Sequence, residues 1–241
     1  MIKIRKAQDR GTADFGWLHS RHTFSFGSYH DPENMGFSDL LVINDDRVEP
    51  AMGFGRHPHR DMEIFSYVLE GKLEHKDSMG TGSVINTGDV QMMSAGTGIM
   101  HSEFNGSKEK LVHFLQIWIQ PNKTGVVPRY QQKYFSGEEK RGRFCLIISP
   151  DGSQGSLGVY QDARVYAGLF DGGEAGRLSL PPNRYAYVHV ARGDVKINGL
   201  EFEAGDGARV TGESELRFAG GKQAEVLVFD LRPRDESPGG R

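Results

Sequence analysis

The sequence has a single cysteine, Cys145, among its 241 residues. One cysteine excludes a disulfide within the chain and suits a reducing compartment, so we expect a cytoplasmic protein. No apolar run reaches the roughly 18 residues that a membrane-spanning helix needs. The N-terminal stretch MIKIRKAQDRG is basic but lacks the apolar segment of a signal peptide. The sequence therefore predicts neither a membrane protein nor a secreted one.

An excess of positive charge is also missing. The chain has 29 lysines and arginines against 32 aspartates and glutamates, for a formal net charge of -3. A protein that holds a phosphate backbone needs a positively charged surface to neutralise it. We therefore expect no direct binding of nucleic acid.

Helical periodicity is rare as well. Apolar residues alternate with polar ones instead, and the 32 glycines recur in pairs such as Gly-Asp and Asn-Gly beside these runs. Residues 63–69, EIFSYVL, end at Glu70-Gly71, and KLEHKDS follows as the expected return strand of a hairpin. A chain of many short strands joined by tight turns predicts an all-β protein, as a barrel or jelly roll of antiparallel strands.

A weak internal repeat divides the chain into two halves. YVLEGKLEH (67–75) is similar to YVHVARGDVKIN (187–198). The repeat predicts an N-terminal barrel over residues 1–135 and a C-terminal barrel over 136–232. Residues 233–241 are charged and rich in glycine and proline, so we expect a disordered tail.

Two pairs of residues carry the chemistry. His57 and His59 stand two apart, as do His101 and Glu103. Residues i and i+2 of a strand share a face, so two such pairs on neighbouring strands can aim three imidazoles and a carboxylate at one point. Imidazole is a ligand for Fe, Ni, Cu and Zn. Glu63 has the same parity as His57 and His59, but it lies about 13 Å from His59 along an ideal strand. Glu103 is therefore the preferred fourth ligand, and Glu63 is the alternative.

The second half of the chain lacks such a set. Aligning the repeat places Ser179 and Pro181 at the positions of the first histidine pair, and Phe218 and Gly220 at those of the second pair. We therefore expect a metal only in the N-terminal barrel. The other histidines are expected to be exposed or satisfied by ordinary hydrogen bonds: His19, His22, His30, His75, His113 and His189.

The arrangement of motifs resembles a known family. G-x3-H-x-H-x3-E followed by YVLEG is similar to the first cupin motif, and GDVQMMSAGTGIMHSEFN to the second, although Ser94-Ala95-Gly96 stands where many cupins have Pro-x-Gly. With RHTFSFGSYHDPENMGF (21–37), VINDD and QIWIQP, the pattern from about residue 1 to 232 resembles that of the pirin family.

The resemblance implies a bicupin, in which two antiparallel β-barrels pack face to face and the N-terminal barrel holds one mononuclear divalent metal. By position, the ligands are His57, His59, His101 and Glu103. Iron is the family's usual metal, and Ni, Cu, Mn, Co or Zn can occupy such sites. Some relatives open the central ring of the flavonol quercetin with O2 and release carbon monoxide. Eukaryotic pirin is an iron-dependent transcription co-regulator, and a few bacterial relatives bind metabolic enzymes.

The resemblance favours a quercetin 2,3-dioxygenase-like enzyme. The metal would bind the 3-hydroxyl of a flavonol, and Glu103 would take its proton as general base. A flat, apolar pocket is expected, with six candidates for its lining that are alternatively plain core: Phe24, Phe26, Met35, Phe37, Phe54 and Phe104. The alternatives are a non-catalytic, redox-sensing regulator that docks a protein partner, and a closed structural zinc site.

Overall fold

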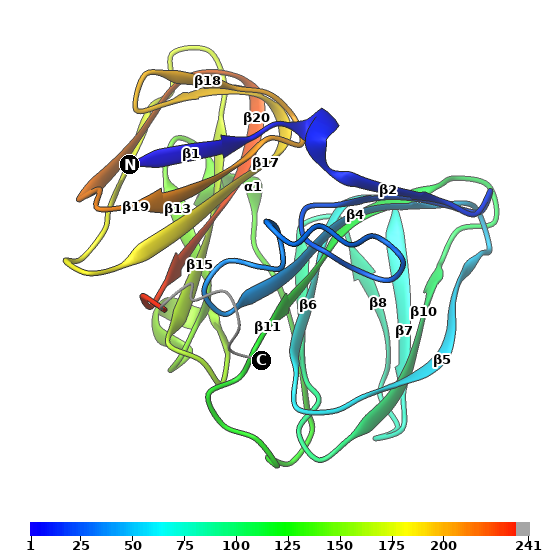
Figure 1. Ribbon diagram of the computed structural model, residues 1–241. Helices are drawn as coiled ribbons and strands as arrows, with labels where there is room; N and C mark the ends of the chain where they lie inside the picture. Colours follow the sequence, from blue (N-terminus) through cyan, green and yellow to red (C-terminus); the bar gives the residue numbers. More distant parts are fainter. Residues whose placement is uncertain (235–241) are drawn as a thin grey trace.

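The computed structural model of the chain describes residues 1–234 and is almost entirely β-structure (Figure 1). The helical elements within this range are one α-helical turn, α1 (Gly137–Lys140), and two 3-10 turns, Ala7–Asp9 and Ser153–Gly155. None of these is long and apolar enough to cross a membrane. The all-β prediction is confirmed.

The N-terminal half forms two antiparallel sheets that face each other. The larger one has the strand order β12-β9-β6-β11-β4-β3-β2. Its strands are β2 (Gly11–Asp14), β3 (Leu18–His22), β4 (Leu40–Val48), β6 (Glu63–Glu70), β9 (Asp89–Ser94), β11 (Val112–Ile119) and β12 (Arg129–Tyr134). The smaller sheet has the order β5-β10-β7-β8, with β5 (Gly53–His59), β7 (Lys72–Asp77), β8 (Gly82–Asn86) and β10 (Ile99–Asn105).

The C-terminal half forms one nine-stranded sheet in the order β1-β19-β17-β20-β15-β13-β14, with β16 on β20 and β18 on β17. Its strands are β1 (Ile2–Arg5), β13 (Phe144–Ser149), β14 (Leu157–Gly158), β15 (Ala163–Phe170), β16 (Gly176–Ser179), β17 (Tyr185–Ile197), β18 (Leu200–Phe202), β19 (Gly207–Thr211) and β20 (Glu215–Leu231). Register shifts interrupt the pairing of β17 with β20, and such bulges bend long strands. The expected barrels are thus open, curled sheets rather than closed ones.

The expected hairpin at Glu70-Gly71 is wrong. β6 pairs with β11 and β9 in the large sheet, whereas β7 pairs with β10 and β8 in the small one. The chain therefore crosses between sheets at Gly71, whose φ is 78°. A Cβ there would lie 2.8 Å from the carbonyl oxygen of Leu111, so only glycine fits this crossing without a shift of the backbone.

The ends of the chain reach across the division between the two halves. β1 pairs with β19, from Ile2 opposite Val210 to Arg5 opposite Gly207, so the first strand belongs to the C-terminal sheet. Arg232 and Arg234 both bond to the buried Asp39 of the N-terminal half. Residues 235–241, most of the predicted tail, lie outside the described residues.

The largest apolar cluster lies between the two halves. Side chains on one face of β6, including Phe65 and Tyr67, join residues of the C-terminal sheet such as Val165 and Phe229 in one buried cluster. At its edge the Tyr67 hydroxyl donates to Glu225 over 2.6 Å. The predicted face-to-face packing of two cupin units is confirmed.

The opposite face of the large sheet carries a row of polar side chains, which we call the polar row. It runs across five adjacent strands as His22, Asn44, Gln116, Ser66 and Gln91, each the register partner of the next. All five are buried. Apolar clusters lie on either side of the row along the strands. Since buried polar groups cost free energy unless they are bonded, these side chains need polar partners in the space that they face.

His189 on β17 corrects the expectation that the remaining histidines are exposed or hydrogen-bonded. It is fully buried, and neither ring nitrogen has a partner among the described residues. Burial, with a contribution from the charge of Arg10, lowers its pKa to about 3.

This lowered pKa predicts a loss of stability in acid. In the unfolded chain this histidine is protonated below about pH 6.5, whereas in the folded protein it stays neutral down to about pH 3. Protons therefore bind preferentially to the unfolded state between these pH values, and the free energy of unfolding falls as the pH drops through that window. At pH 5 we expect a loss of about 2 kcal/mol relative to pH 7 from this residue. The free energy of unfolding is measured in urea at both pH values. Between pH 7 and pH 5, His189→Leu should lose about 2 kcal/mol less of it than the wild type. His30→Gln, a change at an exposed histidine, should lose as much as the wild type. Identical pH dependence in wild type and His189→Leu would contradict the assignment.

Candidate metal centre

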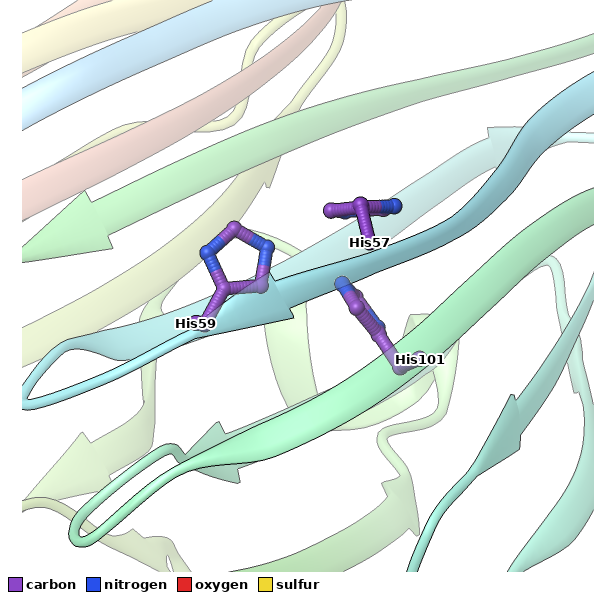
Figure 2. A group of neighbouring side chains, drawn as sticks. All are labelled: His57, His59 and His101. Atoms are coloured by element: carbon purple, nitrogen blue, oxygen red, sulfur yellow. The ribbon is translucent and has the colours of Figure 1, made fainter.

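Three of the predicted ligands converge where β5 lies beside β10. His57 is the register partner of His101, and His59 is two residues further along β5. Figure 2 shows the three imidazoles pointing toward one another from the two strands. The ring centroids of His57 and His101 lie 4.4 Å apart, and that of His59 lies 4.9 Å from each. Each ring offers a nitrogen within 4.8 Å of the others, which is close enough to share one ion.

The ring nitrogens of this cluster have lone pairs available to bind a cation. The Nδ1 of His57 donates to the carbonyl of Gly55 over 2.7 Å, which leaves the Nε2 lone pair free. The Nε2 atoms of His59 and His101 are buried and have no partner among the described residues. Burial, followed by the charge of His57, lowers the pKa of His59 to about 4 and that of His101 to about 2. Neutral imidazoles with orphaned nitrogens fit a bound divalent metal.

Glu103 lies beside this cluster rather than inside it. Its carboxylate groups with His75 and His101 within 4.8 Å, so the two groups share His101. Ser66 and Gln116 of the polar row donate to it over 3.2 and 2.9 Å. Complete burial raises its pKa to about 7, against the lowering effect of these two hydrogen bonds.

Glu63, the alternative ligand, is in neither group. Its carboxylate accepts hydrogen bonds from the Ser94 hydroxyl and the backbone N–H of Tyr160, over 3.0 and 3.2 Å. These contacts place its side chain at the link between the two halves of the chain.

His75 is the residue of this site that the sequence analysis missed. It is completely buried on β7, and its Nε2 contacts Asp77 over 2.9 Å. With Nε2–H donating to Asp77, the Nδ1 of His75 accepts from the Nδ1 of His101, 3.5 Å away. That leaves the unprotonated Nε2 of His101 to face the cluster. A histidine that binds a metal commonly has its other nitrogen held in this way.

The chain from Asp77 through His75 to His101 predicts weaker metal binding when its outer end is changed. Oδ1 of Asp77 accepts from the backbone N–H groups of Met79 and Thr81, so Asp77→Asn would turn its NH2 group toward His75 and put a donor where the acceptor was. The change should lower the affinity for nickel(II) about 10- to 100-fold, measured by competition with a chelator. Asp14→Asn, at the exposed pair of Asp14 with His19, is the matched control and should have no effect. Unchanged affinity in Asp77→Asn would show that the relay does not orient His101.

A cavity of about 310 Å³ opens against the cluster, lined by His57 and His59. Of the predicted aromatic residues, Phe26 and Phe54 line it, and Trp118 joins them with its ring 4.9 Å from that of His59. The other four do not line it, and two of them take the alternative place in the core. Phe24 and Phe37 lie in the core between the halves, and Phe104 and Met35 are 39% exposed and outside this lining.

Two facing cupin units, with a histidine cluster where β5 pairs with β10 in the first, define a bicupin. Family models agree: the model described as Pirin matches residues 3–119, and the model described as Quercetinase C-terminal cupin domain matches residues 146–231. The chain belongs to the pirin family. Both donor groups found among the described residues lie in the N-terminal unit.

Relatives of known name match nearly the whole chain. A protein of Escherichia coli K12 named quercetin 2,3-dioxygenase is 46% identical over 233 residues, which cover 97% of this chain and 100% of the relative. A putative quercetin 2,3-dioxygenase of Pseudomonas aeruginosa is 41% identical, covering 96% and 100%. The structure of the bacterial pirin YhhW from E. coli in complex with nickel(II) is 46% identical and superposes with a TM-score of 0.92, covering 97% of this chain and 100% of that one.

Proposed function

We propose that this protein is a metal-dependent dioxygenase that opens the central ring of a flavonol such as quercetin with O2 and releases carbon monoxide. The observation that carries the proposal is the cavity against His57 and His59, because it gives an organic substrate access to the metal centre. The names of the E. coli and P. aeruginosa relatives support the substrate class.

The proposed metal ligands are His57, His59 and His101, with Glu103, which groups with His101, as the fourth. The nickel(II) complex of the E. coli relative supports one divalent ion, and iron, the metal usual in the family, is the other leading candidate, with Cu, Mn, Co and Zn as further possibilities. When bound, the metal supplies Lewis acidity and a fixed point for the substrate's 3-hydroxyl.

Glu103 is the proposed general base. Burial raises the pKa of Glu103 to about 7 in the metal-free site, and a bound cation would lower it, so the carboxyl would be ionised and able to accept a proton once the metal is in place. Ser66 and Gln116 donate to its two oxygens and fix its plane, so the carboxyl keeps its place as it takes the proton of the 3-hydroxyl. The hydrogen bonds also favour the ionised form, which is the form that accepts a proton.

The aromatic lining holds the substrate rings and excludes water. Phe26 packs edge-on against Trp118 with centroids 5.5 Å apart, and Phe54 packs edge-on against Trp17 over 5.4 Å. Rings held in this way present flat apolar walls to an aromatic ligand. A closed structural zinc site would use all four positions and face no cavity, so the open cavity favours catalysis. The relatives' names favour the enzyme over a regulator that docks a protein partner.

The proposal also assigns a different role to each half of the chain. Residues 1–135, without β1, form the metal-binding unit, and residues 136–232 form a C-terminal unit that supports it through the shared apolar cluster. The single cysteine remains the basis for placing the protein in the cytoplasm.

The proposal is tested by mixing nickel- or iron-loaded protein with quercetin in air and under nitrogen. We expect loss of the flavonol absorbance and carbon monoxide in the headspace only with both metal and O2. Loss at the rate of the metal-free blank, with one metal bound per chain, would exclude the proposed activity.

A further inference from the structure

The cavity has a second polar wall on the sheet that faces the histidine cluster. Ser20 and His22 on β3 are the register partners of Asp46 and Asn44 on β4. All four line the cavity, and none is more than 5% exposed. We call them the polar quartet. Its members alternate along each strand, so the four side chains share one face.

The contacts within the quartet leave one acceptor and one donor group without partners. The Ser20 hydroxyl donates to one oxygen of Asp46, and the Nδ1 of His22 contacts the Oδ1 of Asn44 over 2.8 Å. No hydrogen bond from a described residue reaches the second oxygen of Asp46 or the side-chain nitrogen of Asn44. A hydroxyl group both donates and accepts, so a hydroxylated ligand would satisfy both.

The charge of Asp46 is not balanced by a neighbouring cation. Its pKa is raised to about 7, chiefly by burial and to a smaller extent by the nearby carboxylates of Asp45 and Glu103, against the lowering effect of the hydrogen bond from Ser20. Arg10 and Arg47, the basic residues that form ion pairs with the described part of β4, both bond to Asp45 instead. A buried carboxyl without a cation is costly for folding alone, so its place in a cavity wall points to a ligand.

We propose that the polar quartet is a recognition subsite for phenolic hydroxyls on a ring of the substrate remote from the metal-binding hydroxyl. Asp46 and Asn44 bind the hydroxyls, and Ser20 and His22 hold those two side chains in place. The substrate class is then a polyhydroxylated flavonol rather than the bare flavonol core. This inference rests on the proposed function for the metal-binding end of the ligand, but the subsite itself binds without turnover.

Two ligands separate the subsite from the reaction. Luteolin has hydroxyls on both outer ring systems but lacks the 3-hydroxyl, so it is not a substrate. The second ligand, 3-hydroxyflavone, has the 3-hydroxyl and no others. Calorimetric titration of the full-length protein under nitrogen, with and without nickel(II), measures the affinity for each. Asp46→Asn and Asn44→Leu are two nearly isosteric variants, so the test survives if one fails to fold.

We expect each variant to weaken luteolin binding about tenfold, the value of roughly one hydrogen bond to a buried group, and to leave 3-hydroxyflavone unchanged. Ser94→Ala, which removes a buried hydrogen bond to Glu63 in the same sheet outside the quartet, should change neither affinity. Equal weakening of both ligands, unchanged luteolin affinity, or no luteolin binding by the wild type would each overturn the subsite. Luteolin binding that depends on Asp46 in a protein without quercetin turnover would overturn the proposed reaction and keep the subsite.

Discussion

Replacing His101 by alanine should abolish stoichiometric metal binding. His101 is the one residue common to both donor groups, and its Nε2 is buried without a partner in the described part of the chain. Changing an outer-shell residue already costs about 10- to 100-fold in metal affinity, and the loss of a ligand should exceed that range. Metal content after dialysis and chelator competition measure the effect, and quercetin turnover should fall to the metal-free rate.

The matched control for this variant is His30→Ala, which removes a histidine from an exposed loop. It should retain one metal per chain. If His101→Ala also keeps one tightly bound metal per chain while folding normally, the metal is held elsewhere and the proposed centre is wrong.

Replacing Glu103 by glutamine should lower kcat about 10²- to 10⁴-fold, the usual contribution of a general base. The amide has nearly the shape of the carboxyl, but it cannot take the proton of the 3-hydroxyl. The rates are compared at saturating metal, with bound metal measured in the same samples, so that a lost ligand is not mistaken for a lost base. Glu103→Asp keeps a carboxyl and should retain more activity. A kcat for Glu103→Gln within about threefold of the wild type at full metal occupancy would remove Glu103 from proton transfer.

Strand parity accounts for the part of the site that the sequence predicted. His57 and His59 share a face because they stand two apart, and the same rule aims His101 and Glu103 into the interior. Parity does not reveal which strands are neighbours. The register shift between His101 and Glu103 sets Glu103 opposite Phe54, and the resulting split into two donor groups could not be read from spacing.

The sequence did not reveal His75 or the polar row for the same reason: it does not show which strands are neighbours. His75 reaches the site only because β7 leaves β6 at Gly71 and joins the small sheet beside β10. A local hairpin pattern cannot report such a crossing, because both outcomes use the same turn residues. The sequence showed all five members of the polar row as scattered polar residues, and only the register of five strands brings them into line.

The prediction of the aromatic residues that line the cavity was only partly right, for a further reason. Phe24 and Phe26 stand two apart, yet Phe24 is buried in the core between the halves and Phe26 borders the cavity. Both lie after the end of β3, where side chains no longer alternate between two faces. Trp118 lies on β11 with the parity of Gln116 and so faces the interior, which alternation on an identified strand would have indicated.

The most direct test of the proposed dioxygenase is an isotope experiment. Metal-loaded protein and quercetin are mixed under ¹⁸O2, and the ring-opened product and the headspace gas are analysed by mass spectrometry. A dioxygenase places both atoms of O2 in the organic product and releases unlabelled carbon monoxide, at a rate that requires the bound metal. Product without label, or labelled product formed equally fast by metal-free His101→Ala, would contradict the assignment of this site as the centre of the reaction.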